Sequence, residues 1–155
     1  MQIATFHVDD ELFAVPVLLI EEFFRPVHVT PVPLTDRRIA GLINLRGKSR
    51  TVLDMRSCLG KPADRTGLTG KMIMMETQER LTPEATELGL SAFAEPIVLQ
   101  VDQIDRILTL DPRELQPPPA HLSQRFLDGV TRYDDRYITL VNFADLIEDI
   151  LHDGE

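Results

Sequence analysis

A weak internal repeat is the sequence feature that most constrains the fold of this chain. Residues 41–59, "GLINLRGKSRTVLDMRSCL", lie without gaps over residues 129–147, "GVTRYDDRYITLVNFADLI". In both copies a glycine opens the segment, a polar turn interrupts it and β-type residues follow. A second alignment matches the apolar spacing of residues 17–24 to that of residues 101–108. The repeat predicts two similar β units, each too small to bury its own apolar face, packed around a shared core.

The local pattern predicts mostly short strands, few helices and one domain. We expect strands over residues 3–8, 12–15, 22–29, 71–76, 96–108 and 137–141, and a hairpin over residues 41–60. The expected helical segments are a turn at 16–20, a turn capped by Thr35 that stops at Gly41, a capped helix at 82–89, a capped turn after Asp111 and a C-terminal helix at 143–151. The domain, 1–155, divides into a first half at about 1–60, a loop at 60–70 and a second half at 71–155; exchange of strands between the halves stays open.

Charge and composition exclude several classes of protein. The net charge of −9 argues against nucleic acid and against an anionic membrane surface, because both require a basic face. The single cysteine, Cys58, excludes an internal disulfide and fits a reducing compartment. The first residues, "MQIATFHVDDELF", do not form a signal peptide, and the longest apolar stretch, "FAVPVLLI", is far shorter than the roughly 20 residues of a membrane helix. We therefore expect a soluble, cytoplasmic protein without membrane insertion.

Signatures of catalysis are missing from the sequence. There is no "GxSxG" segment and no Cys/His pattern typical of a nucleophile and its base. The four histidines, His7, His28, His121 and His152, are scattered without the spacing of metal ligands. The segment "GKSRT" lacks the earlier glycine that a phosphate-binding loop requires. We expect no enzyme activity, no cofactor and no metal site.

The segment "RGKSR", residues 46–50, places two arginines and a lysine at the tip of the predicted hairpin. One interpretation is a turn that only keeps the protein soluble. The other is a surface that a partner protein grips, because arginine combines a planar fork of donors with an apolar stem. The local pattern leaves both interpretations open.

An ordered set of short motifs runs through nearly the whole chain, from about residue 3 to residue 151. The first half carries "VPVLLIEEF", "VTPVP", "GLINLRG" and "VLDMR", and the second half carries "IVLQVDQIDRIL", "LQPPP", "FLDGV" and "RYITLVNFADLI". In this order and spacing the motifs resemble the CheW family, the chemotaxis adaptor proteins. The resemblance implies a mainly β fold of two five-stranded SH3-like barrels related by a pseudo-two-fold axis, with short helices and a C-terminal helix.

The same resemblance implies a function and a set of contact residues. The family function is that of a non-catalytic cytoplasmic adaptor that couples chemoreceptors to the histidine kinase CheA, in chemotaxis or in a related pathway such as pilus-driven motility. By position, Arg46 and Gly41 match the receptor-binding residues of the family. Ile20, Glu22 and Phe23 match the element that binds the regulatory domain of the kinase. The structural alternatives are that Arg46 only solubilises a turn and that Phe23 or Phe24 belongs to the core.

Two segments depart from the family pattern. The polar "KSRT" follows "NLRG" where the family has aliphatic residues and a proline, so the partner preference of the hairpin is open. Residues 77–95 are longer than the expected tight turn; we expect a short capped helix there, with "GLSAF" folded back onto apolar surface. The competing class is a small ligand-binding or enzymatic β-barrel whose site is not visible as a motif.

Overall fold

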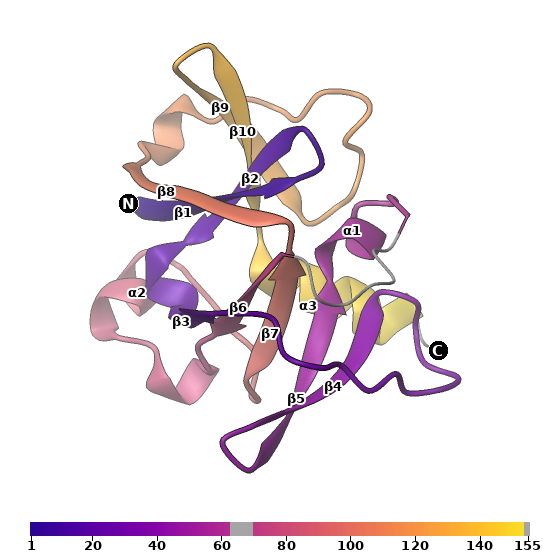
Figure 1. Cartoon of the computed structure of the whole chain (residues 1–155). Helices are drawn as coiled ribbons and strands as arrows, with labels where there is room; N and C mark the ends of the chain where they lie inside the picture. Colours follow the sequence, from indigo (N-terminus) through magenta and orange to yellow (C-terminus); the bar gives the residue numbers. More distant parts are fainter. Residues whose placement is uncertain (63–69, 154–155) are drawn as a thin grey trace.

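The computed structural model describes residues 1–62 and 70–153, so most of the predicted loop at 60–70 lies outside the described residues. The chain forms two five-stranded sheets (Figure 1). Sheet A runs in the order β8 (Gln103–Thr109), β1 (Gln2–Val8), β2 (Glu11–Pro16), β10 (Arg136–Val141) and β9 (Leu127–Tyr133). Sheet B runs in the order β3 (Ile20–Phe24), β6 (Lys71–Met75), β7 (Ile97–Val101), β5 (Lys48–Asp54) and β4 (Ile39–Leu45). The predicted mainly β fold is therefore confirmed.

The internal repeat of the sequence is a repeat of the structure. The two sheets have the same strand order when β3, β4 and β5 are matched to β8, β9 and β10, which are the strands that the sequence alignments superpose. Each sheet also contains one parallel pair, β2 with β10 in sheet A and β7 with β5 in sheet B. Since β1 and β2 join β8, β9 and β10, each sheet combines strands from both sides of the loop at 60–70. We propose residues 1–60 and 71–155 as units of duplication that exchange strands, not as separately packed bodies.

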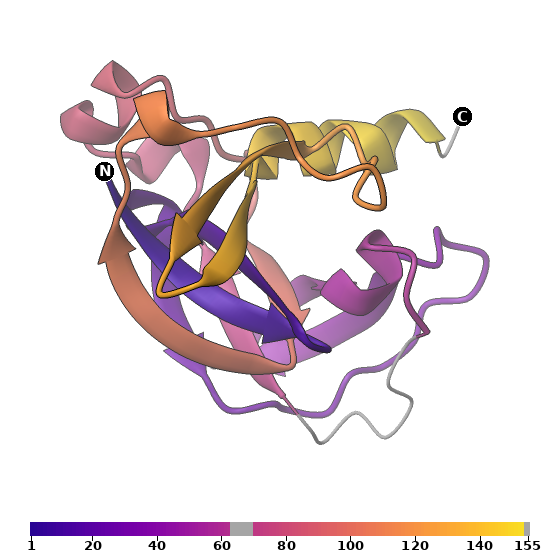
Figure 2. The same cartoon turned by 90° about the horizontal axis from the view of Figure 1, so that it is seen from above.

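Three apolar clusters fill the molecule. The largest lies between the sheets, where the rings of Phe6 and Phe13 stack with centroids 6.1 Å apart and residues of β5, β6 and β7 pack against them. Helix α3 (Phe143–Asp153), yellow in Figure 2, lies along one side of the sheets and adds Phe143, Leu146 and Ile150 to this cluster. Each sheet also has a smaller cluster of its own, around Ile3 in sheet A and around Ile43 in sheet B. Most of the buried apolar side chains therefore lie in one core that both repeat units share, as the repeat predicted.

Glycines fix the β4–β5 hairpin, which is the first of the two hairpins of the repeat. In the β4–β5 turn Arg46 has φ 51° and Gly47 has φ 81°, which is the left-handed pair of a two-residue hairpin turn. Behind this turn Gly41 is buried with φ 147°, and a Cβ placed there would lie 2.1 Å from the carbonyl oxygen of Thr30. That close approach permits the bridge between Thr30 and Leu42, with N···O distances of 2.8 Å and 2.9 Å. The bridge brings the segment after one edge strand, β3, to the other edge strand, β4.

Apart from the turn after Thr35, which is described below, the short helices follow the capping signals of the sequence. In α2 (Pro83–Glu87) the hydroxyl of Thr82 accepts a hydrogen bond from the backbone N–H of Ala85 at 3.2 Å, as predicted. Asn142 caps α3 in the same manner through the N–H of Asp145 at 3.0 Å. The remaining helical segments are 3-10 turns at Val17–Leu19, Gln78–Arg80 and Pro112–Glu114, and the short helix α1 (Met55–Cys58). Within the described residues, none of the helices has the length and apolarity to cross a bilayer.

Two predictions in the segment between β3 and β4 are wrong. The turn capped by Thr35 is not helical, because the Thr35 hydroxyl donates to the carbonyl oxygen of Val32 at 2.8 Å while Asp36 accepts from the N–H of Arg38. The strand expected over 22–29 ends at Phe24, since Pro26 has no N–H for a sheet ladder. The segment between the strands is an irregular strap that crosses the molecule (Figure 1).

Candidate functional site

One predicted receptor residue, Arg46, and one predicted kinase residue, Glu22, meet at the rim of sheet B. The edge strand β3 carries Glu22, and the tip of the β4–β5 hairpin carries Arg46. The guanidinium Nη2 of Arg46 donates to the Oε1 atom of Glu22, so the two side chains form an ion pair although they are 24 residues apart. The Arg46 side chain is 63% exposed and that of Glu22 is 33% exposed, which leaves both accessible to a partner. The family resemblance implies a different partner for each of these residues, and the structure joins the two side chains.

The hairpin tip is basic and is closed by a side-chain hydrogen bond. The side-chain oxygen of Asn44 accepts a hydrogen bond from the N–H of Gly47 at 3.1 Å, which holds the turn closed. Lys48 and Ser49 are exposed, and the half-buried Arg50 donates to the neighbouring carbonyl oxygen at 3.3 Å. The side chains of Lys48 and Ser49 therefore project into solvent beside the Arg46–Glu22 ion pair. The interpretation of "GKSRT" as part of a phosphate-binding loop fails, since this segment is a hairpin and not a strand-to-helix turn.

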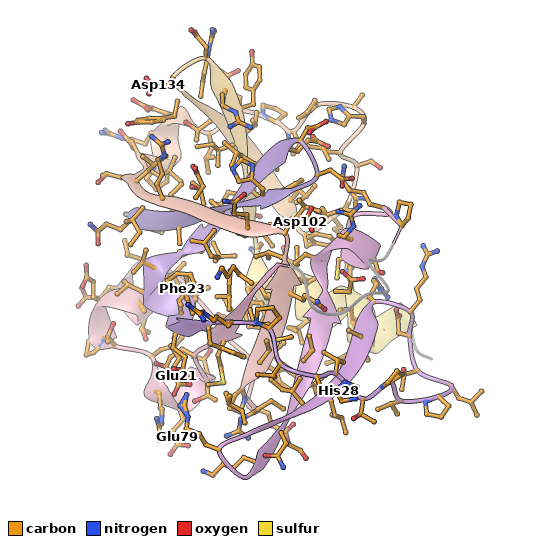
Figure 3. All side chains as sticks on the ribbon, in the orientation of Figure 1. Glu21, Phe23, His28, Glu79, Asp102 and Asp134 are labelled. Atoms are coloured by element: carbon orange, nitrogen blue, oxygen red, sulfur yellow. The ribbon has the colours of Figure 1, made fainter. Side chains whose placement is uncertain are left out.

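Strand β3 presents two different faces. Ile20 is half-buried and packs against the cluster between the sheets, and Phe24 packs against the small cluster of sheet B. Glu21 and Phe23 point outward on the side of the molecule that carries β3, as Figure 3 shows, and Phe23 is 42% exposed. The alternative that Phe23 is a core residue is therefore wrong. An exposed aromatic ring on an edge strand is the kind of anchor that protein interfaces use.

Gly41 lies behind this rim and not on it. Gly41 is buried, and the carbonyl group of Thr30 occupies the space that a side chain at this position would need. It therefore positions the hairpin through its backbone. Whether a receptor also depends on Gly41 stays a prediction.

A network of ion pairs at the junction of the two sheets was not predicted. Arg56 of α1 pairs with Asp9 at 2.6 Å and with Asp102 at 2.7 Å, which ties the β1–β2 turn to the β7–β8 turn. Lys61 continues the network to Glu11 at 3.1 Å, and the ring of His121 reaches the same carboxylate at 3.0 Å. No sequence spacing indicates this network, since its members come from four separate segments.

The network changes the acidity of Glu11. Burial alone would raise the pKa of its carboxyl group, but hydrogen bonds from His121 and Lys61 outweigh burial, and the pKa is lowered from its ordinary value. The carboxylate is thus held in its charged form at the junction. We interpret the network as a structural clamp between the two repeat units.

No described side chains form a catalytic or metal-binding group. Within residues 1–62 and 70–153 there is no set of three His, Cys, Asp or Glu side chains that could hold a metal ion. Burial raises the pKa of the Cys58 thiol to about 12, so it stays protonated and is a poor nucleophile. His7, His121 and His152 each lie near a different carboxylate and do not converge.

Comparison with known proteins agrees with this geometry. The model of the family described as "CheW-like domain" matches residues 2–151. The chemotaxis protein CheW of Rhizobium meliloti (strain 1021) is 27% identical over 143 residues, covering 90% of this chain and 83% of the relative. The chemotaxis protein CheW of Helicobacter pylori is 21% identical over 150 residues, covering 96% of this chain and 82% of the relative.

A solved structure has the same fold. The crystal structure of the scaffolding protein TtCheW from Thermoanaerobacter tengcongensis superposes with a TM-score of 0.72 at 24% identity, covering 90% of this chain and 82% of that chain. The fold, the order of its motifs and the match of the family model over nearly the whole chain lead to one conclusion: the chain belongs to the CheW-like domain family.

Proposed function

We propose that this protein is a non-catalytic, cytoplasmic adaptor that couples chemoreceptors to a CheA-type histidine kinase. The relatives are named as chemotaxis proteins, and the solved structure is titled a scaffolding protein. The observation that carries the proposal is the rim of sheet B, where Arg46, Glu22 and Phe23 are accessible together. The pathway is chemotaxis or a related form of motility.

The receptor side of the proposal rests on the hairpin. Arg46 is presented by a rigid turn, and its guanidinium group can exchange Glu22 for a carboxylate or carbonyl group of the receptor tip. Gly41 supports this presentation from behind, because no other residue fits against the Thr30 carbonyl group. The basic side chains of the "KSRT" segment would add selectivity for an acidic receptor surface.

The kinase side rests on strand β3. Ile20, Glu22 and Phe23 lie on an edge strand, which is a surface that another sheet or barrel can meet. The expected partner is the regulatory domain of the kinase, which the family resemblance gives a CheW-like fold of its own. Phe23 would supply the apolar anchor and Glu22 the charge that fixes the register.

The ion pair makes the two contacts interdependent. A receptor that takes the guanidinium group of Arg46 frees the carboxylate of Glu22, and a kinase that takes Glu22 frees Arg46. By thermodynamic linkage, each partner then changes the affinity of the other by the same factor. The adaptor would transmit receptor binding to the kinase through this rim.

Kinase control in a reconstituted complex tests the proposal. The protein is combined with receptor-containing membranes and a cognate CheA-type kinase, and kinase autophosphorylation is measured. Omission of the adaptor should abolish receptor control, and Glu22→Lys should lower its affinity for the isolated regulatory domain by about 1–3 kcal/mol. Glu148→Lys, an exposed charge reversal on α3, is the matched control and should change neither quantity. Undiminished receptor control without the adaptor would refute the function.

A further inference from the structure

A pocket lies beneath the segment that departs from the family pattern. Its volume is about 390 Å³, and it opens between the residues that follow α2 and the start of α3. Leu88 and Leu90 form one wall, and the core residues Leu19, Leu140 and Phe143 form the other. Leu88 is 46% exposed, so an apolar side chain stands at the entrance of a pocket whose remaining lining includes polar groups such as Ser91 and Asn142. Such a site accepts a bulky aliphatic side chain.

The rim of the same pocket is acidic. Asp128 and Asp145 both line it, and the side-chain amide of Asn142 donates to Asp128 at 3.2 Å. Burial, together with the nearby charge of Asp145, raises the pKa of Asp128. Neither carboxylate forms an ion pair with a lysine or arginine in the part of the chain that the structure describes. The rim therefore favours a cation next to the apolar side chain.

A segment of this chain carries that combination of side chains. Leu34 is fully exposed in the strap between β3 and β4, and its φ of 63° is unfavourable for a residue with a Cβ atom. Arg37 follows three residues later and is also exposed, with no ion pair among the described residues. The adjacent carboxylate of Asp36 is already bound by Arg38 through distances of 2.9 Å and 2.6 Å. A protruding leucine and an available guanidinium group thus lie three residues apart in the same strap.

The strap between β3 and β4 and the segment that follows α2 lie on opposite sides of the molecule. In Figures 1 and 2 this strap extends to the right, whereas α2 and the segment after it lie on the left. The turn therefore has no access to the pocket of its own molecule. A second copy of the chain is therefore the molecule that can present this turn to the pocket.

We propose that copies of this protein associate head to tail, with the Leu34 side chain of one copy seated in the pocket of Leu88, Leu90 and Phe143 in the next. Arg37 of the first copy then faces Asp128 and Asp145 of the second. The contact joins two different surfaces, so it leaves a free turn at one end and a free pocket at the other. It does not use strand β3 or the β4–β5 hairpin, and it does not depend on the proposed adaptor function.

Complementation between two variants tests this arrangement by sedimentation velocity. Wild-type protein is expected to increase in average mass from about 20 µM to about 1 mM, the range in which a small contact becomes populated. Leu34→Asn removes the protruding side chain, and Leu88→Glu blocks the pocket; each variant alone should stay monomeric. An equimolar mixture of the two should form a heterodimer and stop there, since only one turn and one pocket remain. Leu151→Ser, another exposed leucine, is the control and should associate like wild type.

Charge reversal provides a second measurement. Arg37→Glu should weaken self-association at least tenfold, Asp145→Arg should do the same, and a mixture of these two variants should recover it. Because Asp145 lies in the first turn of α3, the melting temperature of the Asp145→Arg variant is measured as well. If this variant is destabilised, Asp128→Arg is used in its place. A wild-type protein that stays monomeric at about 1 mM would overturn the proposal and assign the pocket to a different partner. A mixture of Leu34→Asn and Leu88→Glu that stays monomeric while wild type associates would also overturn it.

Discussion

Removal of the Arg46 side chain should weaken receptor binding while it changes the stability of the protein only slightly. Arg46→Ala breaks the ion pair with Glu22, whose two side chains are 63% and 33% exposed. An ion pair in such an environment contributes about 0.2–1 kcal/mol to the free energy of unfolding. For a chain of this length, 1 kcal/mol corresponds to roughly 2–4 °C in melting temperature. We therefore expect Arg46→Ala to melt at most about 4 °C below wild type.

Arg46→Gly provides the matched comparison. Arg46 has φ 51°, and this left-handed conformation is unfavourable by about 1–2 kcal/mol for a residue with a Cβ atom. Alanine retains that strain and glycine removes it, although glycine also makes the unfolded chain more flexible. The glycine variant should therefore be at least as stable as the alanine variant, while both lack the same side chain.

Receptor binding should respond to the side chain alone. If Arg46 is an interface anchor, both variants should lose about 1–2 kcal/mol of receptor affinity, a roughly 5- to 30-fold rise in Kd. Binding is measured by titration of receptor fragments, and unfolding by denaturant titration of the same preparations. Unchanged receptor affinity in both variants would refute the assignment. A loss of more than about 3 kcal/mol in stability would instead make Arg46 a structural residue.

Three further predictions concern the framework that presents the site. Gly41→Ala should lower the free energy of unfolding by more than about 2 kcal/mol because its Cβ would lie 2.1 Å from the Thr30 carbonyl oxygen. Gly47→Ala should lower it by only about 1 kcal/mol because no atom lies within 4 Å of the added Cβ. A denaturant titration that gives equal losses for the two variants would contradict this. Replacement of residues 79–93 by a short Gly-Ser linker should lower the melting temperature, since apolar residues of this segment pack against the central cluster, and unchanged stability would show the segment to be passive. The lowered pKa of Glu11 means that its stabilisation is present above the ordinary pKa of glutamate and is lost as the pH falls through the folded-state pKa. Glu11→Gln should therefore lose less stability than wild type as the pH falls below 4.5, and parallel pH profiles would exclude this role.

Features with a local signal were predictable from the sequence. The Thr82 and Asn142 caps were correct because each depends on residues within one helical turn. The β4–β5 hairpin was correct because its turn residues and flanking apolar residues lie together in the chain. The prediction of two similar β units was correct for another reason. Alignment of two segments of the same chain indicates a shared architecture even when the contacts between the segments are not known.

Features that depend on distant segments were not predictable in this way. The turn after Thr35 carries a capping residue, yet the backbone follows other hydrogen bonds because the strap must span the molecule between two edge strands. The ion pair between Arg46 and Glu22 arises only because sheet B brings the tip of one hairpin to its opposite edge. The Arg56 network joins turns of both units and has no periodic spacing. Tertiary geometry alone creates these contacts.

The two units of the repeat have the same architecture but opposite charges at their rims. The alignments that match β3 to β8 and β4 to β9 place Glu22 over Arg106 and Arg46 over Asp134. The ion pair of sheet B has no direct counterpart, since Arg106 pairs with Asp105 and lies over the ring of Tyr133 at 5.9 Å. A partner complementary to one rim would meet repulsive charges at the other. The duplication therefore supplies a shared core, and from the opposite charges of its rims we infer that the two ends of the molecule suit different partner surfaces.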